Sequence, residues 1–387
     1  MSLGEVLDRH RVVVCVGCGG VGKTTTAASL AMHAAMQGKR VLCLTIDPAK
    51  RLANSLGLDE MTAEEHAVSP DVFTAQGLTL DGELWAMMLD TKTTFDDLVR
   101  RYASSPEIAE RIMGNKVYEY LSGSLAGTQE YMAMEKLHAV RASDRYDLIV
   151  LDTPPTSNAL DFLDAPERMA NLIDSPAMRW FVQAFEGAGK FSFNLVGKGA
   201  AFLLRGLSRF TGTGFLEVLA EFITDFNDLF GGFRERALQV SAALRSDDVA
   251  FVIVTSPDPL AMDEAIFFSR RLEEFEMKRD AFVINGVHSL FAEPSLPEAE
   301  LVALVRPHLP EDMDAKRAIK RLRRAVDDAR TQAIADRLQA DRLRQRAGQD
   351  LLYIEVPYFE EDVNDLGSLS KVAAYLTGQR TMPTVIS

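Results

Sequence analysis

The sequence has 387 residues and a formal net charge of −14 at pH 7, which allows two or three domains and argues against bulk electrostatic binding to DNA or to an anionic membrane. Its 3 cysteines do not make two pairs, because Cys15 and Cys18 are spaced C-x-x-C and Cys43 stands alone, so neither a four-ligand zinc site nor a disulfide framework is expected. The charged start MSLGEVLDRHR is not a signal peptide, and no run reaches the roughly 18 apolar residues of a membrane span, so we expect a cytoplasmic protein without an integral membrane span.

The first predicted element is a buried strand that leads into a phosphate-binding loop. The strand is the β-branched run from Val12 to Val16, which carries no charge. From Gly17 to Thr24 the spacing is G-x-x-x-x-G-K-T, in which glycines let successive backbone N–H groups point at phosphate oxygens. An alanine-rich helix is predicted from Thr25 to Met36, so that its N-terminus faces the anion.

This loop predicts ATP and Mg²⁺ as ligands. The Lys23 ammonium places a positive charge on the β- and γ-phosphates, and the Thr24 hydroxyl can ligate Mg²⁺. The predicted nucleotide-binding residues of the loop are Gly19, Gly20, Val21, Gly22, Lys23, Thr24 and Thr25.

Further short apolar runs predict the rest of a sheet. They lie at residues 40–46, 146–151, 249–255, 281–284 and 351–356, with helical stretches between them. Such alternation is typical of an α/β fold with a doubly wound, mostly parallel sheet covered on both faces. Ligands of such sheets bind at the carboxyl ends of the strands.

Three polar side chains follow predicted strands. Asp47 could orient or deprotonate a water that attacks the γ-phosphate, although an Asp-Pro turn is the alternative. Asp152 follows four apolar residues, the pattern of a Walker-B carboxylate that holds Mg²⁺ directly or through water. The Asn285 amide can both donate to and accept from adenine, with a cap or turn role as the alternative.

Two helical regions interrupt the sheet pattern. We assign residues 1–90, 141–160 and 246–387 to a P-loop nucleotide-binding domain, and residues 91–140 and 161–245 to an inserted α-helical subdomain. The second region is rich in phenylalanine between Phe181 and Phe233, which indicates either the core of the subdomain or an apolar docking surface for a client or partner.

Residues 297–349 are predicted as a charged helical insertion. A thin apolar stripe runs through it, and the segment from Lys316 to Arg346 is locally basic. A solvated helix is the simpler interpretation, and contact with RNA or an acidic partner is the alternative. The stripe consists of Ile319, Leu322, Val326, Ala329 and Ala333.

Several motifs together resemble one family. GCGGVGKT resembles the G-K-G-G-V-G-K-T loop of the SIMIBI class. TIDPAKRLANSLG and DTPPTSNALDFL are similar to the two switch segments of the arsenical-pump-driving and tail-anchored-protein-targeting ATPases. SPDPLAMDEA, FVING and VPYFEEDVNDLGSL resemble that family's later nucleotide segments, and SLAGTQEYMAMEKL resembles an actinobacterial branch of tail-anchor-targeting-like ATPases.

The resemblance implies a dimeric Mg²⁺-dependent ATPase with Asp47 as its catalytic switch aspartate. It also implies Asp258, Asn285 and Pro357 as nucleotide contacts, with Asp258 reaching toward the partner subunit's ligand.

Two departures from the family pattern qualify this implication. Cys18 replaces the lysine that, in the family, crosses the dimer to the other subunit's nucleotide. A homodimer would then hydrolyse ATP slowly, and a heterodimer with a lysine-bearing paralogue would restore the cation, unless another cation or the helix N-terminus substitutes. The cysteine triad for arsenite is also missing, because Cys15 and Cys43 lie in predicted strands.

We therefore expect an ATP-hydrolysing dimeric switch that couples its nucleotide state to binding of an apolar protein client or partner. One alternative is a pump ATPase for metal oxyanions such as arsenite. The other is a weakly hydrolysing, nucleotide-gated scaffold or regulator, which the loss of the lysine at Cys18 would permit.

Overall fold

The structure is a computed structural model that describes residues 2–46, 51–116, 128–154, 234–292, 296–310 and 312–382, with single positions between 118 and 232. It contains an eight-stranded sheet in the order β3-β4-β2-β5-β1-β6-β7-β8. Neighbouring strands are parallel except for the antiparallel pair β3–β4. The predicted α/β fold is thereby confirmed. The strands are β1 (Val12–Val16), β2 (Arg40–Thr45), β3 (His66–Ala67), β4 (Glu83–Met88), β5 (Leu148–Asp152), β6 (Val249–Thr255), β7 (Arg279–Val287) and β8 (Leu352–Pro357).

Two of these strands were not predicted from the sequence. β4 carries Ala86, Met87 and Met88, residue types that favour helices, yet it pairs with β2 along its whole length. β3 then pairs with β4 through two residues only. Tertiary pairing therefore overrides local preference at this edge of the sheet.

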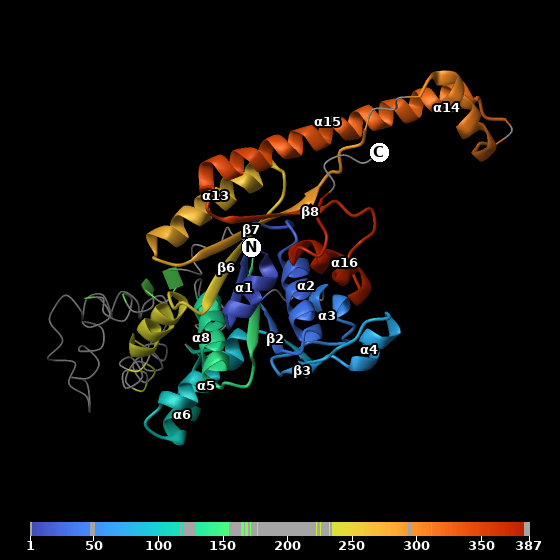
Figure 1. The fold of residues 1–387 in the computed structure, drawn as a ribbon. Coiled ribbons are helices and arrows are strands. Elements are labelled where there is room, and N and C mark those ends of the chain that lie inside the picture. The colour runs from blue at the N-terminus through green and yellow to red at the C-terminus, as the bar shows by residue number, and fades with distance from the viewer. Residues whose placement is uncertain are drawn as a thin grey trace, which may run out of the picture.

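Helices cover both faces of the sheet (Figure 1). Side chains along a strand alternate between faces, so Val13 and Cys15 pack into one apolar cluster and Val12, Val14 and Val16 pack into another. The first cluster includes residues of α1 (Leu3–Arg9), α2 (Lys23–Met36) and α16 (Leu366–Leu376), and the second includes residues of α8 (Thr128–Ala142) and α13 (Pro259–Glu274). Two shorter helices, α3 (Arg51–Ser55) and α4 (Pro70–Ala75), follow β2.

A third buried cluster lies in the first predicted helical region. It unites residues of α5 (Thr91–Tyr102), α6 (Pro106–Met113) and α8. The Ser105 hydroxyl accepts from the N–H of Ile108 and Pro106 is the first helical residue, as their order predicted. The phenylalanine-rich stretch lies outside the described residues, except for single positions such as Phe222, which is buried in this cluster.

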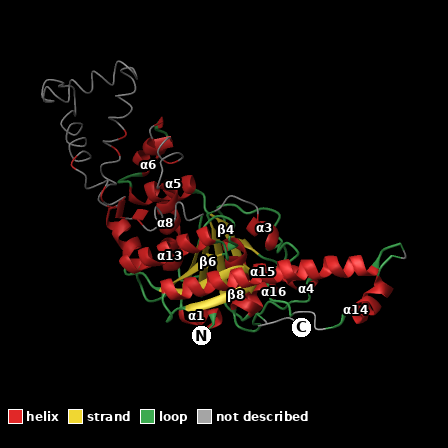
Figure 2. Ribbon diagram, turned by 90° about the horizontal axis from the view of Figure 1, so that it is seen from above, coloured by secondary structure: helices red, strands yellow, loops and turns green. Residues whose placement is uncertain are grey.

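The predicted charged insertion consists of α14 (Glu298–Val305), the 3-10 turn η1 (Arg306–His308) and α15 (Ala315–Ala347), a helix of 33 residues. The C-terminal half of α15 packs on the body through Ala333, Ala340 and Leu343, all fully buried. Its N-terminal half extends past the sheet and carries α14 at its far end (Figures 1 and 2). The expected stripe is only partly internal, because Leu322 is 54% exposed. No described helix, α15 included, is both long and apolar enough to cross a membrane.

Candidate functional site

The loop between β1 and α2 depends on glycine at two positions. A Cβ at Gly17 would lie 2.0 Å from the carbonyl oxygen of Val254 in β6, so no side chain fits there. Gly22 is the N-cap of α2 with φ of 95°, and a Cβ would lie 2.2 Å from Nδ2 of Asn285. Close backbone packing and a left-handed conformation therefore fix the curl of the loop around the N-terminus of α2.

The Lys23 side chain folds back across this loop. It is 7% exposed, and its ammonium donates to the carbonyl oxygen of Cys18 at 2.8 Å. The contact holds the positive charge beside the loop's backbone N–H groups. This arrangement is compatible with anion binding by the loop, which stays a prediction from the spacing of the motif.

Thr24 and Asp152 meet at the foot of the site. The Thr24 hydroxyl donates to Oδ2 of Asp152 at 2.7 Å, and the Thr45 hydroxyl donates to the same oxygen at 3.1 Å. Asp152 is completely buried at the carboxyl end of β5. The two predicted Mg²⁺ ligands are thus adjacent although 128 positions separate them in the chain.

The site fits Mg²⁺ by its donor set. Mg²⁺ prefers oxygen ligands and uses one or two protein groups together with substrate phosphates and water. A threonine hydroxyl and a carboxylate beside an anion-binding loop supply that set. Within the described residues no group of three histidine, cysteine, aspartate or glutamate side chains could hold a metal by itself.

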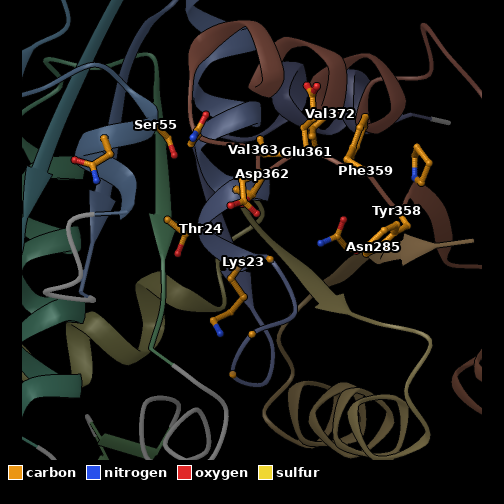
Figure 3. A pocket seen from close by; sticks show the side chains of 18 of the residues that line it. Lys23, Thr24, Ser55, Asn285, Tyr358, Phe359, Glu361, Asp362, Val363 and Val372 are labelled. Atoms are coloured by element: carbon orange, nitrogen blue, oxygen red, sulfur yellow. The ribbon is translucent and has the colours of Figure 1, made fainter.

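A cavity of about 800 Å³ extends from the loop to the ends of β7 and β8. Figure 3 shows Lys23 and Thr24 on one side of it and Asn285 and Tyr358 on the other. Asn285 donates from Nδ2 to the carbonyl oxygen of Val21 at 2.9 Å, so it braces the loop. Further lining residues were not named individually from the sequence, but all except Val372 lie in the segments that resemble the family's switch and nucleotide segments: Asn54, Ser55, Thr153, Gly286, Tyr358, Phe359, Glu361, Asp362, Val363, Asn364 and Val372.

Tyr358 connects this cavity to the long helix. Its ring stacks on His288, with centroids 5.1 Å apart and planes 14° apart. The buried Asp336 carboxylate of α15 lies 2.7 Å from Nδ1 of His288 and accepts from its backbone N–H at 2.8 Å. The quoted segment VPYFEEDVNDLGSL contains Tyr358, but nothing in the sequence pattern pairs it with His288.

A second hollow of about 450 Å³ lies on the outer side of the loop. Cys18, Asp258 and Glu264 line it, and none of the three lines the larger cavity. Burial raises the pKa of the Cys18 thiol, and the Glu264 charge raises it further, so the thiol stays neutral at pH 7. Asp258 caps α13 by accepting from the N–H groups of Leu260 and Ala261. The predicted contact of Asp258 with nucleotide would therefore come from this outer side.

The remaining predicted residues have different outcomes. Thr25 lines the cavity beside Thr24, and Pro357 lines its far end. Asp47, the predicted catalytic residue, lies outside the described residues. Cys15 and Cys43 are fully buried in strands as expected, and burial together with the Asp152 charge raises the pKa of both thiols.

Comparisons with known proteins agree with this geometry. Residues 10–201 match the family model described as Anion-transporting ATPase. The chain is 27% identical over 293 residues to the ATPase GET3 of Phaeosphaeria nodorum, a match covering 73% of this chain and 79% of that protein. It is 29% identical over 178 residues to the ATPase GET3 of Kluyveromyces lactis and 32% identical over 173 residues to that of Ajellomyces dermatitidis, and it spans 48% and 46% of their lengths.

Proposed function

The chain belongs to the anion-transporting ATPase family, and from that premise we propose that it is an ATP-hydrolysing switch whose nucleotide state controls binding of an apolar protein segment. The observation that carries the nucleotide part is the convergence of Lys23, Thr24 and Asp152 at the foot of one cavity. The client part rests on the similarity to ATPase GET3 proteins and on the phenylalanine-rich stretch of the sequence. We also propose a cytoplasmic location, because ATP is abundant there.

In this proposal each side chain of the site has one task. Lys23 and the loop amides hold the β- and γ-phosphates, and Asn285 keeps the loop in its curled form through Val21. Thr24 and Asp152 would hold Mg²⁺, which spreads the charge that develops on the transferred phosphoryl group. Asp47 orients the attacking water and accepts its proton.

The oxyanion-pump alternative is disfavoured. Arsenite binding needs accessible thiolates, whereas Cys15 and Cys43 are fully buried with raised thiol pKa values. Cys18 is half-buried on the outer side of the loop and its thiol is also neutral.

The scaffold alternative differs from the switch in ATP turnover. A scaffold would bind ATP and the client but would hydrolyse ATP very slowly, so neither phosphate nor client would be released on the timescale of a switch. Single-turnover phosphate release measured with and without an apolar peptide separates the two functions.

We further propose that the active assembly is a dimer in which the outer hollow faces the partner. Cys18 lies there and contributes no cation. A homodimer would therefore lack a trans charge at both sites. A heterodimer with a lysine-bearing paralogue would supply that charge to the nucleotide of this chain only.

The first prediction tests the catalytic assignment of Asp47. Asp47→Asn preserves the size of the side chain but removes the proton acceptor, so ATP binding should persist while turnover falls by roughly 10²–10⁴. Phosphate release and the Kd for ATP should be measured on the same preparation. Turnover at the parent rate would remove Asp47 from the mechanism.

A second prediction tests the proposed metal ligand. Asp152→Asn keeps an acceptor for Thr24 but removes the negative charge, so turnover should fall on the order of 100-fold and require more Mg²⁺. Thr45→Val is the matched control, since it deletes the other hydrogen bond to Asp152 without changing its charge. Equal Mg²⁺ dependence in both variants would contradict a metal role for Asp152.

A further inference from the structure

The N-terminal part of α15 carries a dense group of cations on an acidic protein. Six basic residues fall between positions 316 and 324 with no acidic residue among them, whereas the whole chain has a net charge of −14. All six side chains are exposed, and no ion pair involving them is found within the described residues. We call this set the basic cluster: Lys316, Arg317, Lys320, Arg321, Arg323 and Arg324.

The position of the basic cluster works against the stability of the helix. α15 begins at Ala315, so the cations occupy its first turns, where the positive end of the helix dipole disfavours them. Asp312 and Asp314 precede the cluster, and Asp327 and Asp328 follow it. Asp314 is engaged as the N-cap. Cations at a helix N-terminus disfavour folding, and such a conflict is expected where residues serve binding rather than folding.

The fold places the basic cluster away from the acidic body. α15 contacts the body from Arg330 onward, where its guanidinium donates to the carbonyl oxygen of Phe291, about 15 Å along the helix from Lys320 and about 9 Å from Arg324 at 1.5 Å per residue. This separation exceeds the Debye length of about 8 Å at physiological salt. Figure 2 shows the N-terminal half of α15 extending past the body, so the body's negative charge, which argues against bulk binding to an anionic surface, is screened there.

Exposed apolar side chains lie at the same end. Leu304 of α14 is 58% exposed, Met313 is 43% exposed, and Leu322 within the basic cluster is 54% exposed. Arg306 donates to the carbonyl oxygen of Met313 at 2.7 Å, which holds α14 against the start of α15. The inner face is filled by Ile319 and Ala315, both buried. The end of the arm thus presents cations and apolar groups together.

We propose that this end of the arm, α14 with the first turns of α15, docks on an anionic phospholipid bilayer. Lysine and arginine groups are attracted by the negative surface potential, and the leucine and methionine side chains enter the interface. Residues 296–310 and 312–347 contain no phenylalanine, tyrosine or tryptophan, so apart from His308 they lack the aromatic rings on which the bases of single-stranded RNA typically stack. This docking surface is additional to the nucleotide switch.

Vesicle sedimentation tests the proposal with the full-length protein. The protein should sediment with vesicles of phosphatidylcholine mixed with phosphatidylserine but not with phosphatidylcholine alone, and added salt should release it. Each lysine or arginine near an anionic membrane surface raises the partition coefficient onto the vesicles roughly fivefold. The triple variant Arg321→Gln, Arg323→Gln, Arg324→Gln should therefore bind on the order of 100-fold more weakly.

Two further variants make the test specific. The matched control removes three exposed cations from the body, Arg9→Gln, Arg270→Gln and Arg342→Gln, and should bind like the parent. Leu322→Gln should weaken vesicle binding but would leave binding to a polyanion such as RNA unchanged. ATP affinity should be the same in all of them, so a failure here is distinguishable from failure of the nucleotide switch.

Three results would overturn the proposal. The first is that the parent protein does not bind the vesicles. The second is that the control variant loses as much vesicle binding as the triple variant. The third is that the parent binds RNA but not vesicles, and Leu322→Gln leaves the RNA binding unchanged. Self-association that the triple variant abolishes, without vesicle binding, would instead assign the arm to a second copy of the chain.

Discussion

Lys23→Ala is expected to abolish ATP binding while leaving the fold intact. The ammonium is nearly buried and bonds to the carbonyl oxygen of Cys18, so it is already positioned where phosphates meet the loop amides. Hydrogen bonds to charged groups contribute roughly 1.5–3 kcal/mol each. Loss of two phosphate contacts therefore predicts an increase in Kd on the order of 10³-fold, measurable by calorimetric titration with ATP.

The control for this variant is Lys278→Ala. Lys278 forms an exposed ion pair with Asp247 at the far end of the molecule from the loop, and such pairs contribute little. Its affinity for ATP should equal that of the parent. If Lys23→Ala bound ATP within a few-fold of the parent, as judged on a preparation with an unchanged melting curve, the phosphates would have to bind elsewhere.

Cys18→Lys is expected to accelerate ATP turnover by the homodimer. A cation supplied in trans to a transferring phosphoryl group is worth roughly 10³–10⁵ in rate. The parent side chain is a neutral thiol on the outer side of the loop, beside Asp258 and Glu264. These two carboxylates would partly neutralise a new ammonium until a partner's nucleotide competes for it, so the gain should depend on dimer concentration.

Two additional measurements distinguish charge from packing. Cys18→Ser matches the thiol in size and adds no charge, so it should leave turnover unchanged. Adding a lysine-bearing paralogue to the parent chain should raise turnover at the site of this chain and not at the paralogue's own site. A parent homodimer that is already fast, and unmoved by the substitution or the paralogue, would show that the N-terminus of α2 or another cation suffices.

Strands buried on both faces could be predicted because their pattern is local. Val12–Val16 and Val249–Thr255 are fully buried runs of apolar residues, and each was identified from composition alone. Glu83–Met88 was not, because its alanine and methionines favour helix and only pairing with β2 makes it a strand. The prediction that Leu322 lies on an inner apolar face was wrong for a similar reason, because the helix leaves the body at that position.

The residues of the site also divide into those that local sequence predicts and those that depend on tertiary packing. The loop and the position of Asp152 beside Thr24 were predictable, since the motif spacing and the strand-terminal carboxylate are local patterns. At the far end of the cavity, the sequence predicted Asn285 and Pro357 as individual residues and the segments FVING and VPYFEEDVNDLGSL as a whole. Tyr358 and its stack on His288 depend on how α15 and the loop after β8 pack, and no spacing in the sequence brings Asp336 to His288.

The order of strands in the sheet has a consequence for how the molecule folds. β1 carries the loop, yet its two neighbours are β5 and β6, whose paired residues lie more than a hundred positions further along the chain. Contacts between such distant segments carry a large loop-closure entropy and form slowly. The nucleotide loop is thus near the start of the sequence but among the last parts to be completed, and until β6 is in place Gly17 has no backbone to pack against. A nascent chain exposes both edges of β1 until β5 is made and one edge until β6 is made, so it is vulnerable to aggregation during that part of its synthesis.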